Sequence, residues 1–231
     1  MNLLAIDTAC SILSVAVARE NEIFYFETEA GVRHSELVMD CIESQMKKAL
    51  LKPEDISGIL CMGGPGSFTG LRIGFSTAKG LALALSRPFA AIPTLDCIAW
   101  RTINEQKEKL TLAVIEARKN AYFYTFYSDG KRLKPDEDAG ITEITREIEK
   151  YQKTEPGIAL TGPGADSLYD LLPQELKKNL RLDYEKRGFA KELISIAKKQ
   201  NILDNVVSAF LYSGPEYIRK TDAETAIGQS I

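Results

Sequence analysis

The chain has 231 residues, and 45% of them are hydrophobic, enough to bury one large core or two small ones. Its 29 basic and 32 acidic residues give a net charge of −3 without a sustained run of either sign, which argues against a free-standing nucleic-acid binder. The four cysteines form no CxxC pair, so we expect a reducing cytoplasm. No basic signal-peptide region and no run of ~20 apolar residues is present, so neither export nor membrane insertion is indicated.

The first half of the chain alternates between β-rich and helical patterns. Three β-rich runs joined by short turns predict three strands, the last two forming a hairpin. Apolar residues at three- and four-residue spacing then predict the first helix. The expected order is three strands, helix, strand, helix, strand, helix, at residues 2–7, 12–19, 22–29, 34–51, 56–62, 68–85, 89–92 and 95–106.

The same order returns in the second half. We expect strands at residues 110–116, 122–127, 157–160 and 180–184 and helices at 142–151, 165–172 and 189–200. "AIDTACS" is echoed by "VIEARKN", and Gly64-Pro65-Gly66 by Gly162-Pro163-Gly164, each about 100 residues later, which indicates a duplication. We therefore predict an α/β protein of two lobes, residues 1–106 and 107–231, each a mixed sheet flanked by helices, with a cleft between them.

Asp7 and Thr8 end the first predicted strand. In a lobe of this order that position faces the interlobe cleft, where a carboxylate can hold a metal-bound water and backbone amides can approach a phosphate. The alternative is an Asp-Thr pair that only caps its own turn. The sequence leaves both interpretations open.

A glycine-rich segment, residues 63–72, joins a predicted strand to a predicted helix. It lacks the Lys-Ser/Thr of a P-loop after Gly70 and has Thr69 where the dinucleotide fingerprint needs a small residue. We expect Ser67 to cap the helix and leave amides that suit an anion. The candidates for a vestigial nucleotide cleft are Asp7, Thr8, Gly64, Gly66, Ser67, Gly162 and Gly164.

Small residues follow two faces of the helix after Ser67. They are Gly70, Gly74, Ala78 and Ala82 on one face and Ser76, Gly80 and Ala84 on the other. Because a glycine inside a helix costs about 1 kcal/mol relative to alanine, close neighbours are expected on these faces. One stripe can pack on the lobe's own sheet, and the other on the helix at residues 34–51 or on a helix of another chain.

His34 is the only histidine in the chain. One histidine without a Cys or carboxylate cluster at ligand spacing predicts no metal site, and Ser-His-Asp or Cys-His chemistry is not supported either. We expect His34 or Ser35 to cap a helix, with Glu36 near its positive end.

Six segments spanning nearly the whole chain match one known family. They read "LLAIDTA", "GGPGSFTGLRIG", "AKGLALAL", "IPTLD", "IEARKNAYFY" and "PEYIR". Together they resemble the bacterial TsaB (YeaZ) family of tRNA threonylcarbamoyladenosine biosynthesis proteins. The resemblance implies two RNase H-like lobes of the actin-like ATPase (ASKHA) superfamily. It also implies a non-catalytic partner and activator of the TsaD subunit, which transfers threonylcarbamoyl to the tRNA adenosine next to the anticodon.

The resemblance further implies partners and an interface. The expected partners are a TsaD-like catalytic subunit, a TsaE-like ATPase, a second copy of the chain when it is alone, and tRNA only through the complex. No cofactor is expected, although a nucleotide at the joint surface with the partner is left open. The family's interface helices match those beginning near His34 and after Ser67. The implied interface residues are Leu37, Val38, Cys41, Ile42, Met46, Gly70, Gly74, Phe75 and Ala78.

The chain departs from the family at one position, because Glu116 stands where the family has the Asp of a "DAR" segment. The late segment matches at Pro215, Tyr217, Ile218 and Arg219. The catalytic paralogue's HxxxH metal motif cannot form with one histidine, which also disfavours a metallopeptidase. The alternative function is an ATP-dependent phosphotransferase or ATPase, since related two-lobed folds bind ATP in their cleft and Asp7 could serve there.

Overall fold

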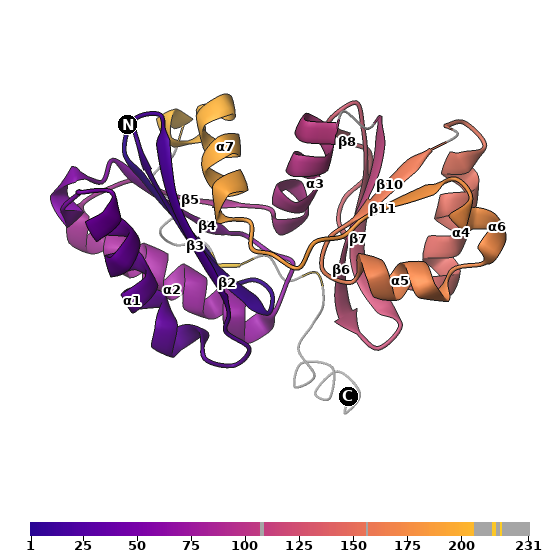
Figure 1. Ribbon diagram of the computed structural model, residues 1–231, viewed down its shortest axis with the longest axis horizontal. Coiled ribbons are helices and arrows are strands. Elements are labelled where there is room, and N and C mark those ends of the chain that lie inside the picture. Colours follow the sequence, from indigo (N-terminus) through magenta and orange to yellow (C-terminus); the bar gives the residue numbers. More distant parts are fainter. Residues whose placement is uncertain (107–108, 156, 206–213, 216–217, 219–231) are drawn as a thin grey trace, which may run out of the picture.

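Two lobes, each built on one mixed sheet, lie side by side in the computed structural model (Figure 1). The structure describes residues 1–106, 109–155, 157–205, 214–215 and 218. Of the late segment "PEYIR", Tyr217 and Arg219 therefore lie outside the described residues. The predicted fold class, two mixed sheets flanked by helices, is confirmed.

The first sheet has the strand order β3-β2-β1-β4-β5. The first three strands pair antiparallel, whereas β4 and β5 add in parallel. The elements are β1 (Leu3–Asp7), β2 (Ile12–Arg19), β3 (Glu22–Glu29), α1 (His34–Lys48), η1 (Pro53–Asp55), β4 (Gly58–Met62), α2 (Phe68–Leu85) and β5 (Phe89–Ile92). All the strands and helices predicted here are confirmed, with bounds that differ by three residues or fewer.

The second sheet has the order β11-β10-β6-β7-β8, and β9 pairs with the same strand β7. Its elements are β6 (Leu110–Arg118), β7 (Ala121–Ser128), β8 (Lys131–Arg132), β9 (Glu137–Gly140), α4 (Ile141–Gln152), β10 (Ile158–Thr161), α5 (Ala165–Leu171), α6 (Gln174–Lys177) and β11 (Leu180–Asp183). The strands β9-β7-β6-β10-β11 repeat the order and directions of the first sheet, so the predicted duplication is confirmed.

Strand β9 was not predicted. Its sequence, EDAG, has none of the β-branched or aromatic residues that mark a strand. It pairs with β7 through backbone contacts from Ala121↔Gly140 to Tyr124↔Glu137. Its neighbour in space rather than its own composition makes it a strand.

The two helices that end the repeats, α3 (Thr94–Gln106) and α7 (Ala190–Gln200), are exchanged between the lobes. Helix α3 packs against β6 of the second sheet, whereas α7 packs against β1 and β2 of the first, and the two helices touch each other (Figure 1). A further short helix, η2 (Ile202–Asn205), follows α7. The division predicted at residues 106 and 107 therefore places both helices with the wrong sheet.

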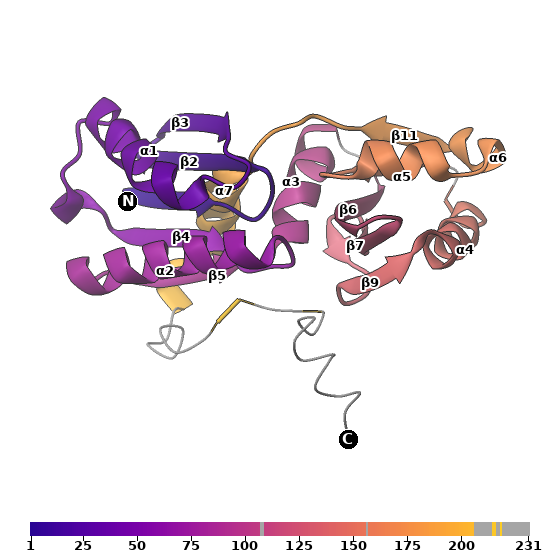
Figure 2. The same cartoon turned by 90° about the horizontal axis from the view of Figure 1, so that it is seen from below.

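Side-chain alternation along the strands creates these layers. On β1, Leu4 and Ile6 pack with α1 and α2, whereas Leu3 and Ala5 face the layer that contains α3 and α7. Figure 2 looks onto α1 and α2, with the first sheet and α7 behind them. Since the α3–α7 layer contacts both sheets, one continuous core joins the lobes.

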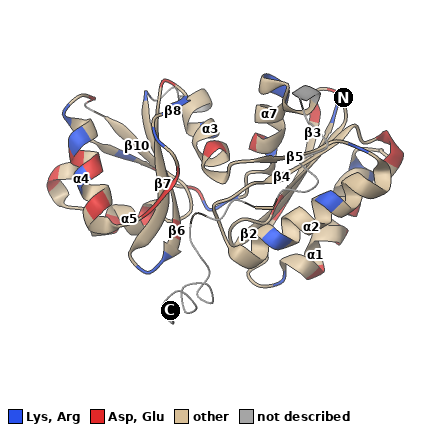
Figure 3. Cartoon of the chain, turned by 180° about the vertical axis from the view of Figure 1, so that it is seen from behind, with Lys and Arg blue, Asp and Glu red and all other residues tan. Residues whose placement is uncertain are grey.

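Acidic and basic side chains are interspersed over both lobes, and α4 carries both signs (Figure 3). In the part of the chain that the structure describes, no helix is both long enough and apolar enough to cross a bilayer. Within the same residues, no three His, Cys, Asp or Glu side chains gather in a way that could hold a metal ion.

Candidate functional site

A cleft of about 830 Å³ lies between the lobes. The first lobe lines it with the β1–β2 turn and the starts of α1 and α2, and the second lobe lines it with the end of β6, Phe123 of β7 and the start of α5. The connection from β11 to α7, residues 184–187, also borders it. The duplicated loops thus face one another across one cleft, as the two-lobed prediction implies.

Each Gly-Pro-Gly turn docks on the first hairpin of its own lobe. In the first lobe, the Ser67 amide donates to the Ala9 carbonyl at 2.7 Å, and a Cβ on Gly66 would lie 2.6 Å from that oxygen. In the second lobe, the Glu116 amide donates to the Pro163 carbonyl at 2.7 Å, and a Cβ on Gly164 would lie 2.7 Å from the Glu116 nitrogen. Glycine is needed at both turns because backbone approaches backbone.

Asp7 does not face the cleft, so that prediction is wrong. The side chain is 2% exposed, and its Oδ1 accepts the Ala9 amide at 3.0 Å. Its Oδ2 accepts the Phe189 amide at 2.8 Å, directly before α7. Burial raises the pKa of this carboxyl to about 6, against the lowering effect of those amide hydrogen bonds. The carboxylate therefore holds the first residues of α7 against the end of β1.

Thr8 likewise makes its hydrogen bond within the first lobe. Its Oγ1 donates to the Gly70 carbonyl at 2.7 Å. A Cβ on Gly70 would lie 2.0 Å from the Thr8 carbonyl, and one on Gly74 would lie 2.5 Å from Thr8 Oγ1. The first small stripe of α2 therefore lets this helix approach β1, as the internal-packing alternative predicted.

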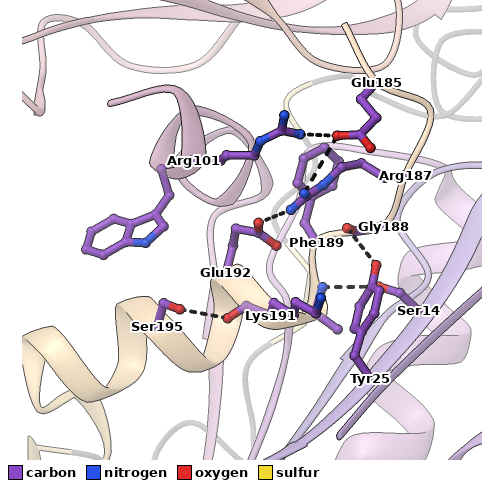
Figure 4. Close-up of polar contacts among 12 residues, drawn as sticks. Ser14, Tyr25, Arg101, Glu185, Arg187, Gly188, Phe189, Lys191, Glu192 and Ser195 are labelled. Atoms are coloured by element: carbon purple, nitrogen blue, oxygen red, sulfur yellow. Dashed lines mark hydrogen bonds and ion pairs between the residues drawn. The ribbon is translucent and has the colours of Figure 1, made fainter. Parts of the chain in front are cut away.

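A strap at residues 184–189 crosses from the second lobe back to the first (Figure 1), and Figure 4 shows its polar contacts. The strap and the residue after it present three successive backbone amides to first-lobe side chains: Gly188 to Glu27 at 2.8 Å, Phe189 to Asp7, and Ala190 to Ser14 at 3.1 Å. Arg187 pairs with the buried Glu192 of α7, and Arg101 of α3 pairs with Glu185. The sequence showed no signal for this strap, because its partners are far away along the chain.

The charges that line the cleft come from the second lobe and from the connection to α7. Glu116 and Asp166 belong to the second lobe, Glu185, Lys186 and Arg187 belong to the connection, and none of the first-lobe lining residues is acidic. Glu116 is exposed, and its Oε2 accepts from Ser167 Oγ at 3.3 Å. Cys10 also borders the cleft, and burial raises the pKa of its thiol.

The vestigial-cleft candidates fall into two groups. Gly66, Ser67 and Gly164 line the cleft. Asp7, Thr8, Gly64 and Gly162 are not among its lining residues; Gly162 instead sits where a Cβ would lie 2.2 Å from the Val114 carbonyl. Ser67 caps α2 as predicted, accepting the Gly70 amide at 3.2 Å.

The start of α1 differs from its prediction. Arg33 is the N-cap, no side chain caps the helix, and His34 is the first helical residue, so the predicted cap by His34 or Ser35 is wrong. His34 is 5% exposed and borders the cleft. Glu36 lies in the first turn, as predicted.

The predicted interface residues lie mostly inside the first lobe. The buried ones are Val38, Cys41, Ile42, Met46, Gly70, Gly74, Phe75 and Ala78, whereas Leu37 is half-buried. Except at the two glycines, their side chains contribute to the core between the sheet and its two helices, because these apolar positions face the sheet. Contact of these residues with a partner stays a prediction.

The second small stripe of α2 is exposed. Ser76, Gly80 and Ala84 all face solvent, and Leu83 beside them is 64% exposed. A Cβ on Gly80 would meet nothing within 4 Å beyond the helix's own backbone. Helix α1 therefore does not cover this stripe.

Comparison with known proteins places the chain in a family. A family model described as "TsaD: tRNA N6-adenosine threonylcarbamoyltransferase" matches residues 28–161, more than half of the chain. The chain belongs to this family. The TsaB protein of Buchnera aphidicola subsp. Baizongia pistaciae is 26% identical over 219 residues, covering 90% of this chain and 97% of the relative. TsaB of Bacillus subtilis is 37% identical over 100 residues, 43% of this chain and 44% of the relative.

Among solved structures, YeaZ from Pseudomonas aeruginosa matches this TsaD-family chain with a TM-score of 0.74 and 24% identity, covering 94% of this chain and 99% of that one. At this identity the likeness shows a shared fold. The resemblance to the TsaB (YeaZ) family that the sequence segments indicate is confirmed.

Proposed function

We propose that this chain takes part in tRNA threonylcarbamoyladenosine biosynthesis as a non-catalytic partner and activator of a TsaD-like subunit. The names of its TsaB relatives support the pathway. The matching family model describes the threonylcarbamoyltransferase itself, which supports a partner of related fold. Two related chains can pair through equivalent faces, as isologous subunits do.

Gly80 is the observation that carries the proposal. A glycine inside an exposed helix costs about 1 kcal/mol relative to alanine. Close approach to Thr8 accounts for Gly70 and Gly74, but nothing in the described chain lies against Gly80. With Ser76 and Ala84 it forms a flat strip beside the exposed Leu83, on which another helix can lie closely. We infer that the partner's helix occupies this strip.

The state of Asp7 supports a non-catalytic role. A carboxylate that serves phosphoryl transfer must reach the substrate or its metal ion. Both oxygens of Asp7 instead accept backbone amides, and the side chain is 2% exposed. This weighs against the alternative of an ATP-dependent phosphotransferase or ATPase with Asp7 as its carboxylate.

The test is a charge placed on the strip. Gly80→Arg should reduce co-purification with the TsaD-like subunit of the same organism at least about tenfold, because a buried unpaired charge costs several kcal/mol at an interface. Gly80→Ala is the control: it should keep the complex and raise the chain's own stability by about 1 kcal/mol. Undiminished complex formation by a folded Gly80→Arg chain would contradict the proposal.

Gly74 and Ala78 are unsuitable for this test. A side chain at Gly74 would strike Thr8, and Ala78 is fully buried, so a charge at either position would disrupt the lobe itself.

The proposal extends to the other partners. A TsaE-like ATPase belongs to the same assembly, and the chain alone forms a homodimer through the Gly80 strip. The chain contacts tRNA only through the complex, in the cytoplasm.

A further inference from the structure

Ile218 brings the late part of the chain to the interlobe cleft. It is the last residue that the structure describes, it borders the cleft, and it packs against the core that joins the two lobes. Consecutive Cα atoms are about 3.8 Å apart, so bond geometry alone keeps the Cα atom of Lys220 within ~8 Å of that of Ile218. The residues that follow Ile218 are therefore tethered at the cleft.

Two carboxylates on the second-lobe wall of this cleft lack a cationic partner. Glu116 accepts a hydrogen bond from the neutral Ser167 hydroxyl, and neither Glu116 nor Asp166 forms an ion pair with a described residue. The third acidic lining residue, Glu185, pairs with Arg101. The cations of the strap, which border the same cleft, already pair with other carboxylates. The second-lobe wall therefore favours an additional cation.

The sequence after Ile218 supplies such cations. It reads Arg219-Lys220-Thr221-Asp222, with both cations first. Because Ile218 is held at the cleft, pairing with the second-lobe wall is intramolecular, and the tether gives a millimolar effective concentration without the loss of translational freedom that a separate partner incurs. Two ion pairs of up to about 1 kcal/mol each can then hold the segment.

His34, on the first-lobe wall, is an independent observation that the cleft has an occupant. It borders the cleft and is 5% exposed, and its Nε2 atom has no hydrogen-bond partner in the described part of the chain. Leaving a buried polar atom unpaired costs about 1–3 kcal/mol, so native structures normally supply a partner. Thr221 and Asp222, directly after the two cations, carry oxygens that can accept from an imidazole N–H.

We propose that residues 219–222 bind in the interlobe cleft, with Arg219 and Lys220 paired to Glu116 and Asp166. The chain thus occupies its own cleft, and a small molecule has to displace this segment to enter. The inference does not depend on the Gly80 strip, which lies on the outer face of α2, so the two proposals can fail separately.

Zero-length carbodiimide cross-linking of the full chain tests the contact, because it joins a lysine amine to a carboxylate at ion-pair distance. Peptide mapping should find Lys220 linked to Glu116 or Asp166. The internal standard is the exposed pair Lys47–Glu43, whose Nζ and Oε1 atoms are 2.6 Å apart. A Lys47–Glu43 link without a link from Lys220 to either carboxylate would overturn the proposal.

A mixture of chains with natural and heavy isotopes identifies the occupant. The proposal expects the Lys220 link to join peptides of the same isotope mass, because both belong to one chain. Links that join light peptides to heavy ones as often as to light ones would place a second copy of the chain in the cleft and would overturn the proposal.

Charge reversal provides a second readout. His34 is the only histidine, so its imidazole NMR signals report on the cleft without ambiguity. Arg219→Glu/Lys220→Glu should shift these signals, because the second-lobe wall then repels the segment. Adding Glu116→Lys/Asp166→Lys should move the signals back toward those of the parent chain, since opposite charges face each other again. Unmoved signals in the first variant, or no return in the combined one, would contradict the pairing.

The matched control is Lys47→Glu/Lys48→Glu, which reverses two adjacent cations at the far end of α1, outside the cleft lining. It should leave the His34 signals in place. A shift as large as that of Arg219→Glu/Lys220→Glu would show a general charge effect and would overturn the proposed contact.

Discussion

The two lobes share one topology but use their equivalent carboxylates in opposite ways. In the first lobe Asp7 is buried, and its oxygens accept the amides of Ala9 and Phe189. In the second lobe Glu116 is exposed at the cleft, with Ser167 as its hydrogen-bond partner. The difference arises because the strap before α7 covers the end of β1. Duplication therefore conserves the layout of a lobe while the crossing segments decide what each duplicated residue does.

Replacing the glycines at which the two Gly-Pro-Gly turns dock should cause the largest loss of stability. Gly164 has φ of +114° and a backbone contact, so Gly164→Ala adds both backbone strain and a clash, together about 4 kcal/mol of lost stability. Gly66→Ala adds only the clash with Ala9, about 2 kcal/mol. Urea unfolding of both variants measures the difference. Equal losses would show that the two turns are energetically equivalent.

Titration of Asp7, in the first lobe, should make the free energy of unfolding depend on pH. Its pKa rises from an ordinary 3.8 to about 6 in the folded chain, chiefly through burial. The folded state therefore binds this proton more tightly than the unfolded state. The stability that Asp7 contributes is present below pH 3.8 and is lost as the pH rises through 6, by about 3 kcal/mol.

The measurement is urea unfolding of the parent chain and of Asp7→Asn between pH 4 and pH 7. The parent should lose stability relative to the variant over this range, since asparagine does not titrate. Glu116→Gln, at an exposed carboxylate, is the control and should follow the parent. Parallel curves for the parent and Asp7→Asn would contradict the pKa assignment.

Replacing the serines beside Asp7 and Glu116 should cause the smallest losses of stability. Ser14 is fully buried, donates to Asp7 at 3.4 Å and accepts the Ala190 amide, so Ser14→Ala leaves that amide unpaired and should cost about 2 kcal/mol. Ser167 is half-buried, and water can replace its hydroxyl, so Ser167→Ala should cost under about 1 kcal/mol. Thermal unfolding compares them, and a larger loss at Ser167 would contradict this view of the strap.

Most of the fold is predictable from the sequence, because its strands and helices carry strong periodic patterns. Strand β2 and helix α2 begin and end at the predicted residues. Strand β9 is not predictable, since EDAG has no strand propensity and pairs only because β7 lies beside it. The exchange of α3 and α7 also leaves no local signal, because both helices would look equally amphipathic on either sheet.

The candidate site was predicted less well. The sequence correctly indicated the paired Gly-Pro-Gly turns, the Ser67 cap and two small stripes on α2. It misplaced Asp7, and its interface residues, which stay a prediction, are mostly ones that the lobe itself buries. Apolar periodicity marks the core face of a helix, so it cannot by itself reveal a partner's face.

The sequence by itself determined most of the secondary structure, the duplication and the family, since each is recorded in local spacing or in matching segments. Only the tertiary structure decided that Asp7 holds α7, that Glu116 faces the cleft, and that Gly80 rather than Gly74 lies uncovered. These outcomes depend on which distant segment packs beside each residue. The same residue type at the same spacing can be buried or exposed, so only the packing of distant segments decides which of the two occurs.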